Sequence, residues 1–330
     1  MKIAIFSVSQ KGKKLAENLE KKLNKDSTII KIDTYYKNVK KNITNAFNEY
    51  DAIIGIMATG ILVRSISPLI VSKTKDPAVI SIDESGNFVI SLLSGHIGGA
   101  NKLTEKIANI INGTPVITTA TDVNNKLAID TLSNKFYWKI ENPENIVIFN
   151  KALLNDEKID LILNNKHAKY IKKFLDDKLE FNLVISNDNW INAKFDNYLL
   201  DIIPSKLVVG VGARKGISEK KVLNAIKSTM DTLDLDIDRI DSLATIDVKK
   251  NELGIIKTAD NLNVPLNIVK SNIVKDFDNK YCSKSSFVED KIGVSGVCEP
   301  CALITAGEGS ELIYKKTAFD GVTVAVAVSK

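Results

Sequence analysis

The 330-residue sequence has little cysteine, little arginine and no long apolar run. Its three cysteines, Cys282, Cys298 and Cys301, form an odd set without a disulfide framework, which is typical of a reducing compartment. The longest apolar runs, such as Val322–Val328, are strand-length and fall far short of the roughly 20 residues that cross a bilayer. The apolar start is followed by a lysine-rich amphipathic stretch instead of a signal-peptide cleavage site. We therefore expect a cytoplasmic protein with no membrane segment.

Aromatic residues make up only 6% of the chain, and the net charge of +5 is scattered among acids instead of forming a basic block. Neither feature favours a surface that stacks bases or tracks phosphates, so we expect no nucleic-acid partner. A hydrophobic content of 44% is typical of globular proteins, and the length allows two or three domains.

Two cofactor motifs are missing as well. The Gly-x-Gly-x-x-Gly spacing of dinucleotide-binding folds does not occur, and the glycine-rich stretch Gly210–Gly216 lacks the Gly-Lys-Ser/Thr order of a phosphate-binding loop. The Cys298-Glu-Pro-Cys301 pair has the spacing of a redox or zinc pair but has no second pair or histidine nearby. We expect neither a cofactor nor a protein-bound metal.

Alternating strand and helix patterns predict an α/β fold in three parts: residues 1–130, a small middle domain over 131–205, and 206–330. In the first part, strands over 2–8, 28–32 and 51–57 predict a mostly parallel sheet, and the last of them leads into an expected turn at Ala58-Thr59-Gly60. Strands over 78–82 and 88–93 flank the turn-forming sequence DESGN and predict a hairpin.

The later parts carry fewer signals. In the middle domain, we expect strands over 160–163 and 179–186 and a helix near 167–176. The last domain begins with a strand that runs into Gly210–Gly216 and a helix from Ser218. A further helix over 249–262, capped by Asp247, is predicted there.

The sequence SLLSGHIGGAN combines a strand end, a glycine turn and a helix start, a combination that favours anion or oxyanion binding. His96 lies inside this turn, where it is either an acid-base group or a structural histidine bonded to nearby backbone. His167, on a lysine-rich helix start, is expected to be solvated.

Arg64, Arg214 and Arg239 are the only arginines among 45 basic residues. Two of them lie beside glycine-rich turns, where a planar guanidinium can grip a carboxylate or phosphate; an ordinary surface ion pair is the alternative. Arg214 and Lys215 make Gly210–Gly216 either a second anion-binding turn or a plain structural turn. Glu299, at a predicted helix start, is either functional or a favourable first-turn charge.

Several stretches together resemble the cobalt-precorrin-5A hydrolase family. They are ATGI with Arg64, DPAVISIDESGNFVISLLSGHIGGANKLTEKIA, PVITTATD, GVGARKG, ATIDVKKNELG, GVSGVCEPCAL, LIYKK and TVAVAV. The resemblance covers both ends of the chain and is weak over 131–205. Ala213, Cys298 and Cys301 depart from the family pattern at loosely defined places.

The resemblance implies a Rossmann-like N-terminal domain, a small middle α/β domain and a C-terminal α/β domain of the type also seen alone in CobE proteins. It also implies hydrolysis of the δ-lactone that joins the ring A acetate of cobalt-precorrin-5A to C20, with release of acetaldehyde and formation of cobalt-precorrin-5B in anaerobic cobalamin synthesis. Cobalt then arrives inside the tetrapyrrole substrate and is not a cofactor of the protein.

For this reaction, we expect His96 to be the base and the amides of Gly98, Gly99 and Ala100 to hold the oxyanion. Glu84, Asp83 or Glu299 would deprotonate the freed hydroxyl. The residues expected to bind the substrate are Gly60, Arg64, Gly95, Gly98, Gly99, Asn101, Thr119, Asp122, Gly212, Arg214, Lys215, Lys249 and Glu252.

Two alternatives stay open: a non-catalytic carrier of tetrapyrrole intermediates, and a Rossmann-like transferase using a nucleotide or S-adenosylmethionine. The carrier predicts tight binding without acetaldehyde, and the transferase predicts cofactor binding in the first domain. The sequence leaves the oligomeric state open, a homodimer included, and other cobalamin-pathway enzymes are candidate partners.

Overall fold

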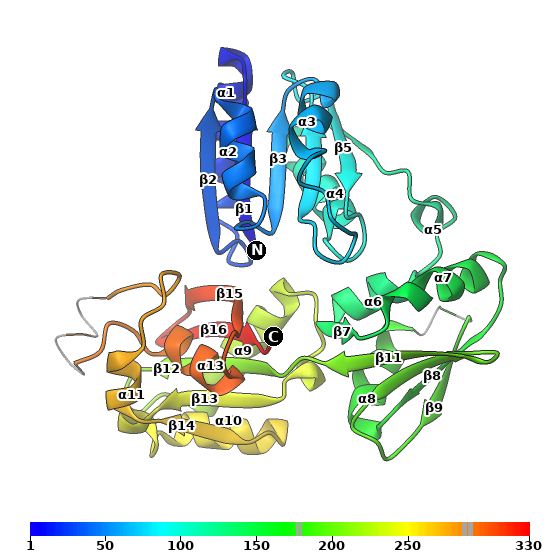
Figure 1. The fold of residues 1–330 in the computed structure, drawn as a ribbon. Coiled ribbons are helices and arrows are strands. Elements are labelled where there is room, and N and C mark those ends of the chain that lie inside the picture. Colours follow the sequence, from blue (N-terminus) through cyan, green and yellow to red (C-terminus); the bar gives the residue numbers. More distant parts are fainter. Residues whose placement is uncertain (176–177, 179, 286–288, 290–292) are drawn as a thin grey trace. The chain divides into compact units, whose positions relative to one another are not determined.

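The chain folds into two compact units. The first comprises Met1–Asn164 and Leu175–Ile203, and the second comprises Asn165–Phe174 and Pro204–Lys330. The computed structural model describes residues 1–175, 178, 180–285, 289 and 293–330. Over these residues the strands form three sheets, one within each of the predicted ranges 1–130, 131–205 and 206–330 (Figure 1).

The N-terminal sheet has the strand order β2-β1-β3-β4-β5-β6. Strands β1 to β4 are mutually parallel, β5 runs antiparallel to β4, and β6 is parallel to β5. The strands are β1 Lys2–Ser7, β2 Lys31–Tyr36, β3 Ala52–Ile56, β4 Ala78–Ile82, β5 Phe88–Leu93 and β6 Thr114–Val116. The helices around them are α1 Gln10–Leu23, α2 Val39–Ala46, α3 Thr59–Ile66 and α4 Ala100–Ile111.

Both faces of this sheet are covered, because successive side chains of a strand point to opposite faces. Ile3 and Ile5 of β1 pack with α1 and α4 in one apolar core. Ala4 and Phe6 pack with α2 and α3 in the other. A mostly parallel sheet with helices on both faces is the predicted Rossmann-like arrangement, and the α/β fold class is confirmed.

The middle sheet has the order β7-β11-β10-β8-β9. Its strands are β7 Trp138–Ile140, β8 Ile159–Leu163, β9 Phe181–Ile185, β10 Ile191–Phe195 and β11 Tyr198–Pro204. The helices that precede or flank it are α5 Ala120–Val123, α6 Ile129–Lys135 and α7 Ile146–Leu154. The predicted strand 179–186 is β9, and Leu179 lies outside the described residues. The helix predicted near 167–176 is α8 (Asn165–Phe174), which belongs to the second unit; Asp176 also lies outside the described residues.

The C-terminal sheet has the order β14-β13-β12-β16-β15. Its strands are β12 Leu207–Ala213, β13 Ser242–Ile246, β14 Leu266–Val269, β15 Glu311–Ala318 and β16 Val322–Val328, and its helices include α9 Glu219–Thr232, α10 Leu253–Leu262, α11 Ser271–Asp276 and α13 Cys298–Ala306. Short 3-10 turns η2 (Ile237–Arg239) and η3 (Asp247–Lys249) precede β13 and α10.

Two local predictions are wrong. The expected turn Ala58-Thr59-Gly60 is the start of helix α3, which forms because Leu62 packs onto Gly55 of β3. The helix predicted from Lys249 starts at Leu253, and Asp247 accepts a hydrogen bond from the Ser271 amide at 2.9 Å instead of capping it.

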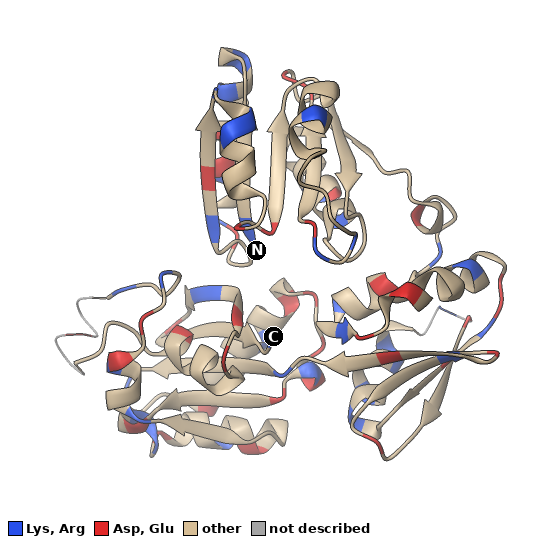
Figure 2. Cartoon of the chain, viewed as in Figure 1, with Lys and Arg blue, Asp and Glu red and all other residues tan. Residues whose placement is uncertain are grey.

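Within the described residues, no helix has both the length and the apolar character needed to span a membrane. Basic and acidic side chains are interspersed over the elements of both units (Figure 2).

Candidate functional site

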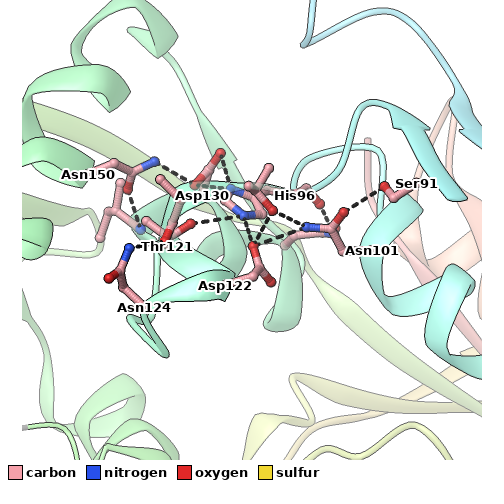
Figure 3. A network of polar contacts seen from close by, with 12 residues as sticks. Ser91, His96, Asn101, Thr121, Asp122, Asn124, Asp130 and Asn150 are labelled. Carbon is pink, nitrogen blue, oxygen red and sulfur yellow. Dashed lines mark hydrogen bonds and ion pairs between the residues drawn. The ribbon is translucent and has the colours of Figure 1, made fainter. Parts of the chain in front are cut away.

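His96 lies at the centre of a polar network in the first unit (Figure 3). Its Nε2 is 2.7 Å from Oδ2 of Asp122, and its Nδ1 is 3.3 Å from the carboxylate of Asp130. The ring comes from the turn between β5 and α4, whereas the carboxylates come from α5 and α6. The His96 side chain is 13% exposed, so the ring is largely withdrawn from water while flanked by two acids.

Two opposing effects set the pKa of His96. Burial disfavours the charged ring, but the hydrogen bonds and charges of Asp130 and Asp122 outweigh burial and raise the pKa to about 9. Burial also acts on Asp130 in the direction of a higher pKa, yet His96 and Asn150 hold the pKa of this carboxyl below its usual value. At neutral pH, His96 is therefore an imidazolium that donates from both nitrogens. Only the neutral ring could accept a proton, and the role of base predicted for His96 stays a prediction.

Asn101 and Thr119 complete the network around Asp122. The Asn101 amide nitrogen donates to Thr119 Oγ1 at 2.8 Å and to Asp122 Oδ2 at 3.1 Å, and the Thr119 hydroxyl donates to the same oxygen at 2.6 Å. Gly95 lies against Asn101, where a Cβ would come within 2.8 Å of the Asn101 Oδ1. The structure thus brings together the predicted residues Gly95, His96, Asn101, Thr119 and Asp122.

The amides of the turn are mostly engaged within it. Gly99 N donates to the carbonyl of His96 at 3.0 Å, and Ala100 N donates to the carbonyl of Ser94 at 3.1 Å. Gly98 has no room for a Cβ, which would lie 2.5 Å from that of Ser94, and Gly99 has a φ of +79°. These glycines are needed for the shape of the turn, and the oxyanion role expected of the Gly99 and Ala100 amides is not available in this conformation.

The β4–β5 hairpin separates His96 from Asp83 and Glu84. The two acids follow β4, at the carboxyl edge of the parallel strands. The His96 turn follows β5, which is antiparallel, and therefore lies at the opposite edge, beside the start of β4. There the Ser94 hydroxyl donates a hydrogen bond to the carbonyl of Asp76. Five residues of β4 at roughly 3.3 Å each place the two edges roughly 16 Å apart. His96 and these carboxylates therefore do not share one centre.

A pocket of about 530 Å³ opens at the carboxyl edge. Asp83 lines it but is occupied in the hairpin turn, where its oxygens accept from the amides of Ser85 and Phe88 at 3.0 and 2.7 Å. Glu84 accepts a hydrogen bond from the Ser9 hydroxyl at 2.7 Å. Gly60 and Arg64 lie on α3 at the same edge, with Arg64 Nη1 3.5 Å from the position of a Cβ on Gly60.

The remaining predicted site residues belong to the second unit. Glu299 is buried, and its oxygens accept hydrogen bonds from Ser283 N, Ser283 Oγ and Lys316 N at 2.6 to 2.8 Å. Glu299 lies in the first turn of α13, as one sequence alternative predicted, and its carboxylate also ties two further segments to this helix.

The first two glycines of the stretch Gly210–Gly216 allow close packing against neighbouring segments. A Cβ on Gly210 would lie 1.9 Å from the carbonyl oxygen of Cys298, and one on Gly212 would lie 2.6 Å from Thr323 Oγ1. The Gly216 amide donates to Glu252 at 2.9 Å. Arg214 and Lys215 are exposed, and Lys249 lies on η3.

The buried thiols of Cys298 and Cys301 are protonated at neutral pH. Burial raises the pKa of Cys298 to about 12 and raises that of Cys301 further. In the part of the chain that the structure describes, no three His, Cys, Asp or Glu side chains gather as a possible metal-ligand set.

Sequence reasoning missed Asp130, Asn150 and Ser9. Asp130 lies 34 residues from its partner His96, and Asn150 donates to Asp130 at 3.1 Å from a different helix. No local sequence motif indicates Asp130 or Asn150. Ser9 could have been found as the N-cap of α1, where its side chain accepts from Gly12 N.

Two family models match the chain. The model described as Cobalamin synthesis G N-terminal matches residues 41–122, and the one described as Cobalamin synthesis G C-terminus matches residues 207–327. The fold and these matches define an α/β protein of cobalamin synthesis.

Relatives of known name match the whole chain. The protein named "Probable cobalt-precorrin-5A hydrolase" from Methanocaldococcus jannaschii is 35% identical, covering 99% of both chains. The cobalt-precorrin-5A hydrolase of Salmonella typhimurium is 30% identical, covering 99% of this chain and 97% of its own. The chain belongs to the cobalt-precorrin-5A hydrolase family.

Solved structures are also similar. A cobalamin biosynthesis protein G homologue from Sulfolobus solfataricus has 29% identity and a TM-score of 0.64, covering 100% of this chain and 97% of its own. CobE, a protein from the cobalamin (vitamin B12) biosynthetic pathway, matches 39% of this chain and 93% of its own with 28% identity and a TM-score of 0.37.

Proposed function

We propose that this chain hydrolyses cobalt-precorrin-5A, opening the δ-lactone between the ring A acetate and C20 and releasing the two-carbon bridge as acetaldehyde. The observation that carries the proposal is the match to relatives named for this substrate over 99% of the chain, so both units are shared with them. Cobalt enters with the substrate.

The chemistry requires water, a base and a place for negative charge. Water adds to the lactone carbonyl, a base takes its proton, and the acyl C–O bond breaks to leave a carboxylate on ring A and a hydroxyl on the two-carbon bridge. Deprotonation of this hydroxyl then breaks the C–C bond in retro-aldol fashion. The conjugated macrocycle accepts the electron pair and later a proton, and acetaldehyde leaves.

His96 supports this function as a positively charged bridge. Its two ion pairs hold the turn after β5 against α5 and α6, which fixes the position of Asp122. Asp122 is exposed, and within the described residues its Oδ1 has no hydrogen-bond partner. This oxygen can accept a hydrogen bond from a donor group of the substrate or from a water molecule.

Acetaldehyde release tests the proposal. Purified protein mixed with cobalt-precorrin-5A under anaerobic conditions should release one equivalent of acetaldehyde per substrate consumed, measured by an aldehyde-trapping assay. Tight substrate binding without acetaldehyde would instead establish the tetrapyrrole carrier. Binding of S-adenosylmethionine or a nucleotide with no acetaldehyde would favour the transferase.

A further inference from the structure

The pocket at the carboxyl edge lies where the order of the strands reverses. From β1 the chain passes through α1 to β2 on one side and returns to β3 on the other side of β1. The connections leaving β1 and β3 therefore diverge, and in open α/β sheets such a crevice is the usual place for a ligand. The residues after both strands line the pocket, Val8 and Ser9 from β1 and Met57 to Thr59 from β3.

Apolar side chains of the wall are left exposed to solvent. Phe88 at the start of β5 is 52% exposed, and Val8 after β1 is 38% exposed. Ile90 and Val116 continue the same wall. An exposed apolar surface inside a concave site gains free energy when a ligand covers it. The volume of about 530 Å³ admits one edge of a macrocycle with its substituents.

Glu84 is the acidic group held in place at this wall. Ser9 Oγ accepts from Gly12 N at 3.0 Å, which directs the hydroxyl hydrogen to Glu84 Oε2 at 2.7 Å. Within the described residues, Glu84 Oε1 has no hydrogen-bond partner. One carboxylate oxygen is thus fixed by the protein, and the other is available to a substrate or a water molecule.

Cations lie around the same edge. Lys11 donates to the Ser85 hydroxyl at 2.7 Å, beside Glu84 in the hairpin turn, and Arg64 extends over Gly60 at the start of α3. Both side chains are exposed. An apolar wall, a single available carboxylate oxygen and flanking cations complement the edge of a ring that carries acetate arms.

We infer that this pocket is the reaction chamber for the lactone-bearing edge of the substrate and that Glu84 Oε1 is the catalytic base. This inference rests on the proposed hydrolysis. Glu84 takes a proton from the attacking water as the acyl C–O bond breaks, and passes it to the product or solvent. It then takes the proton of the freed hydroxyl as the C–C bond breaks. Water is the co-reactant, and no oxidant or reductant is needed.

The Glu84→Gln variant tests the inference. Glutamine can still accept the Ser9 hydrogen bond through its amide oxygen, so α1 keeps its N-cap while the base is lost. We expect kcat for acetaldehyde release to fall at least about a hundredfold, with substrate binding and the thermal midpoint unchanged. Glu105→Gln, which removes an exposed carboxylate from α4, is the matched control and should behave as wild type.

A second variant locates the substrate. Phe88→Ala removes part of the apolar wall and should raise KM about tenfold with a smaller change in kcat. If wild type releases acetaldehyde and folded Glu84→Gln does so at the same rate, the inference is overturned and the proposed function stands. If wild type releases none, the proposed function itself fails.

Discussion

Replacing His96 by glutamine should destabilise the protein by roughly 3 kcal/mol at pH 6.5, and the loss should shrink as the pH rises towards about 9. The amount corresponds to the rise in the pKa of His96 from 6.5 to about 9, at roughly 1.4 kcal/mol per pKa unit. Because the pKa is higher in the folded than in the unfolded chain, the stabilisation is complete below pH 6.5 and disappears as the pH passes about 9. In the variant, the buried Asp130 also loses its cationic partner.

Urea unfolding of both proteins across this pH range measures the effect. His167→Gln is the matched control, because His167 is buried instead of solvated as the sequence predicted, and burial lowers its pKa to about 4 and keeps it neutral in the folded chain. Because only the unfolded chain titrates His167 above pH 6.5, its effect on the free energy of unfolding should change by no more than about 0.4 kcal/mol over the range, in the direction opposite to that of His96. A His96 effect that is equally flat, or that grows with pH, would contradict the imidazolium bridge.

Replacing Arg239 by methionine should cost roughly 3–5 kcal/mol of unfolding free energy, the range for breaking a buried ion pair. Arg239 is 1% exposed; its guanidinium donates to Asp241 Oδ2 at 2.7 Å and to the carbonyl of Ser205 at 2.5 Å. The variant leaves Asp241 with only the half-exposed Lys166 as a cationic partner, and it leaves the Ser205 carbonyl without this donor. It also loses the contact with the Tyr170 ring on α8.

Thermal and urea unfolding of the full chain test this prediction, with Arg214→Met as the control at an exposed arginine. The control should change the free energy of unfolding by no more than about 0.5 kcal/mol. Arg239→Lys should fall in between, because lysine keeps the charge but cannot reach two acceptors with a planar fork. Equal stability of Arg239→Met and wild type would show that the buried pair contributes nothing net.

The elements of the N-terminal sheet were predictable where local signals agreed. The two hairpin strands have the predicted bounds 78–82 and 88–93, because short apolar runs flank a turn-forming pentapeptide. Strand β2 was placed about three residues early, since the apolar Ile29 and Ile30 precede it and its own residues alternate with polar ones. Helix α3 was missed because a glycine and β-branched residues lower its propensity, and tertiary packing outweighs that.

The site was only partly predictable. His96 and its turn were identified from sequence, but its partner Asp130 is distant in sequence and its high pKa depends on that contact. The predicted hairpin itself places Glu84, in its turn, and His96, after its second strand, at opposite edges of the sheet. Glycines of the GVGARKG stretch suggested an anion site, whereas Gly210 is required by contact with α13.

The fate of the oxygen atom of water tests the hydrolysis most directly. The reaction is run anaerobically with cobalt-precorrin-5A in water enriched in oxygen-18, and the corrinoid product is analysed by mass spectrometry. The proposed reaction predicts one heavy oxygen in the ring A acetate carboxylate of each product molecule, together with one equivalent of acetaldehyde. A product formed with acetaldehyde but without the heavy oxygen would show that water does not attack the lactone carbonyl, and would contradict the proposal.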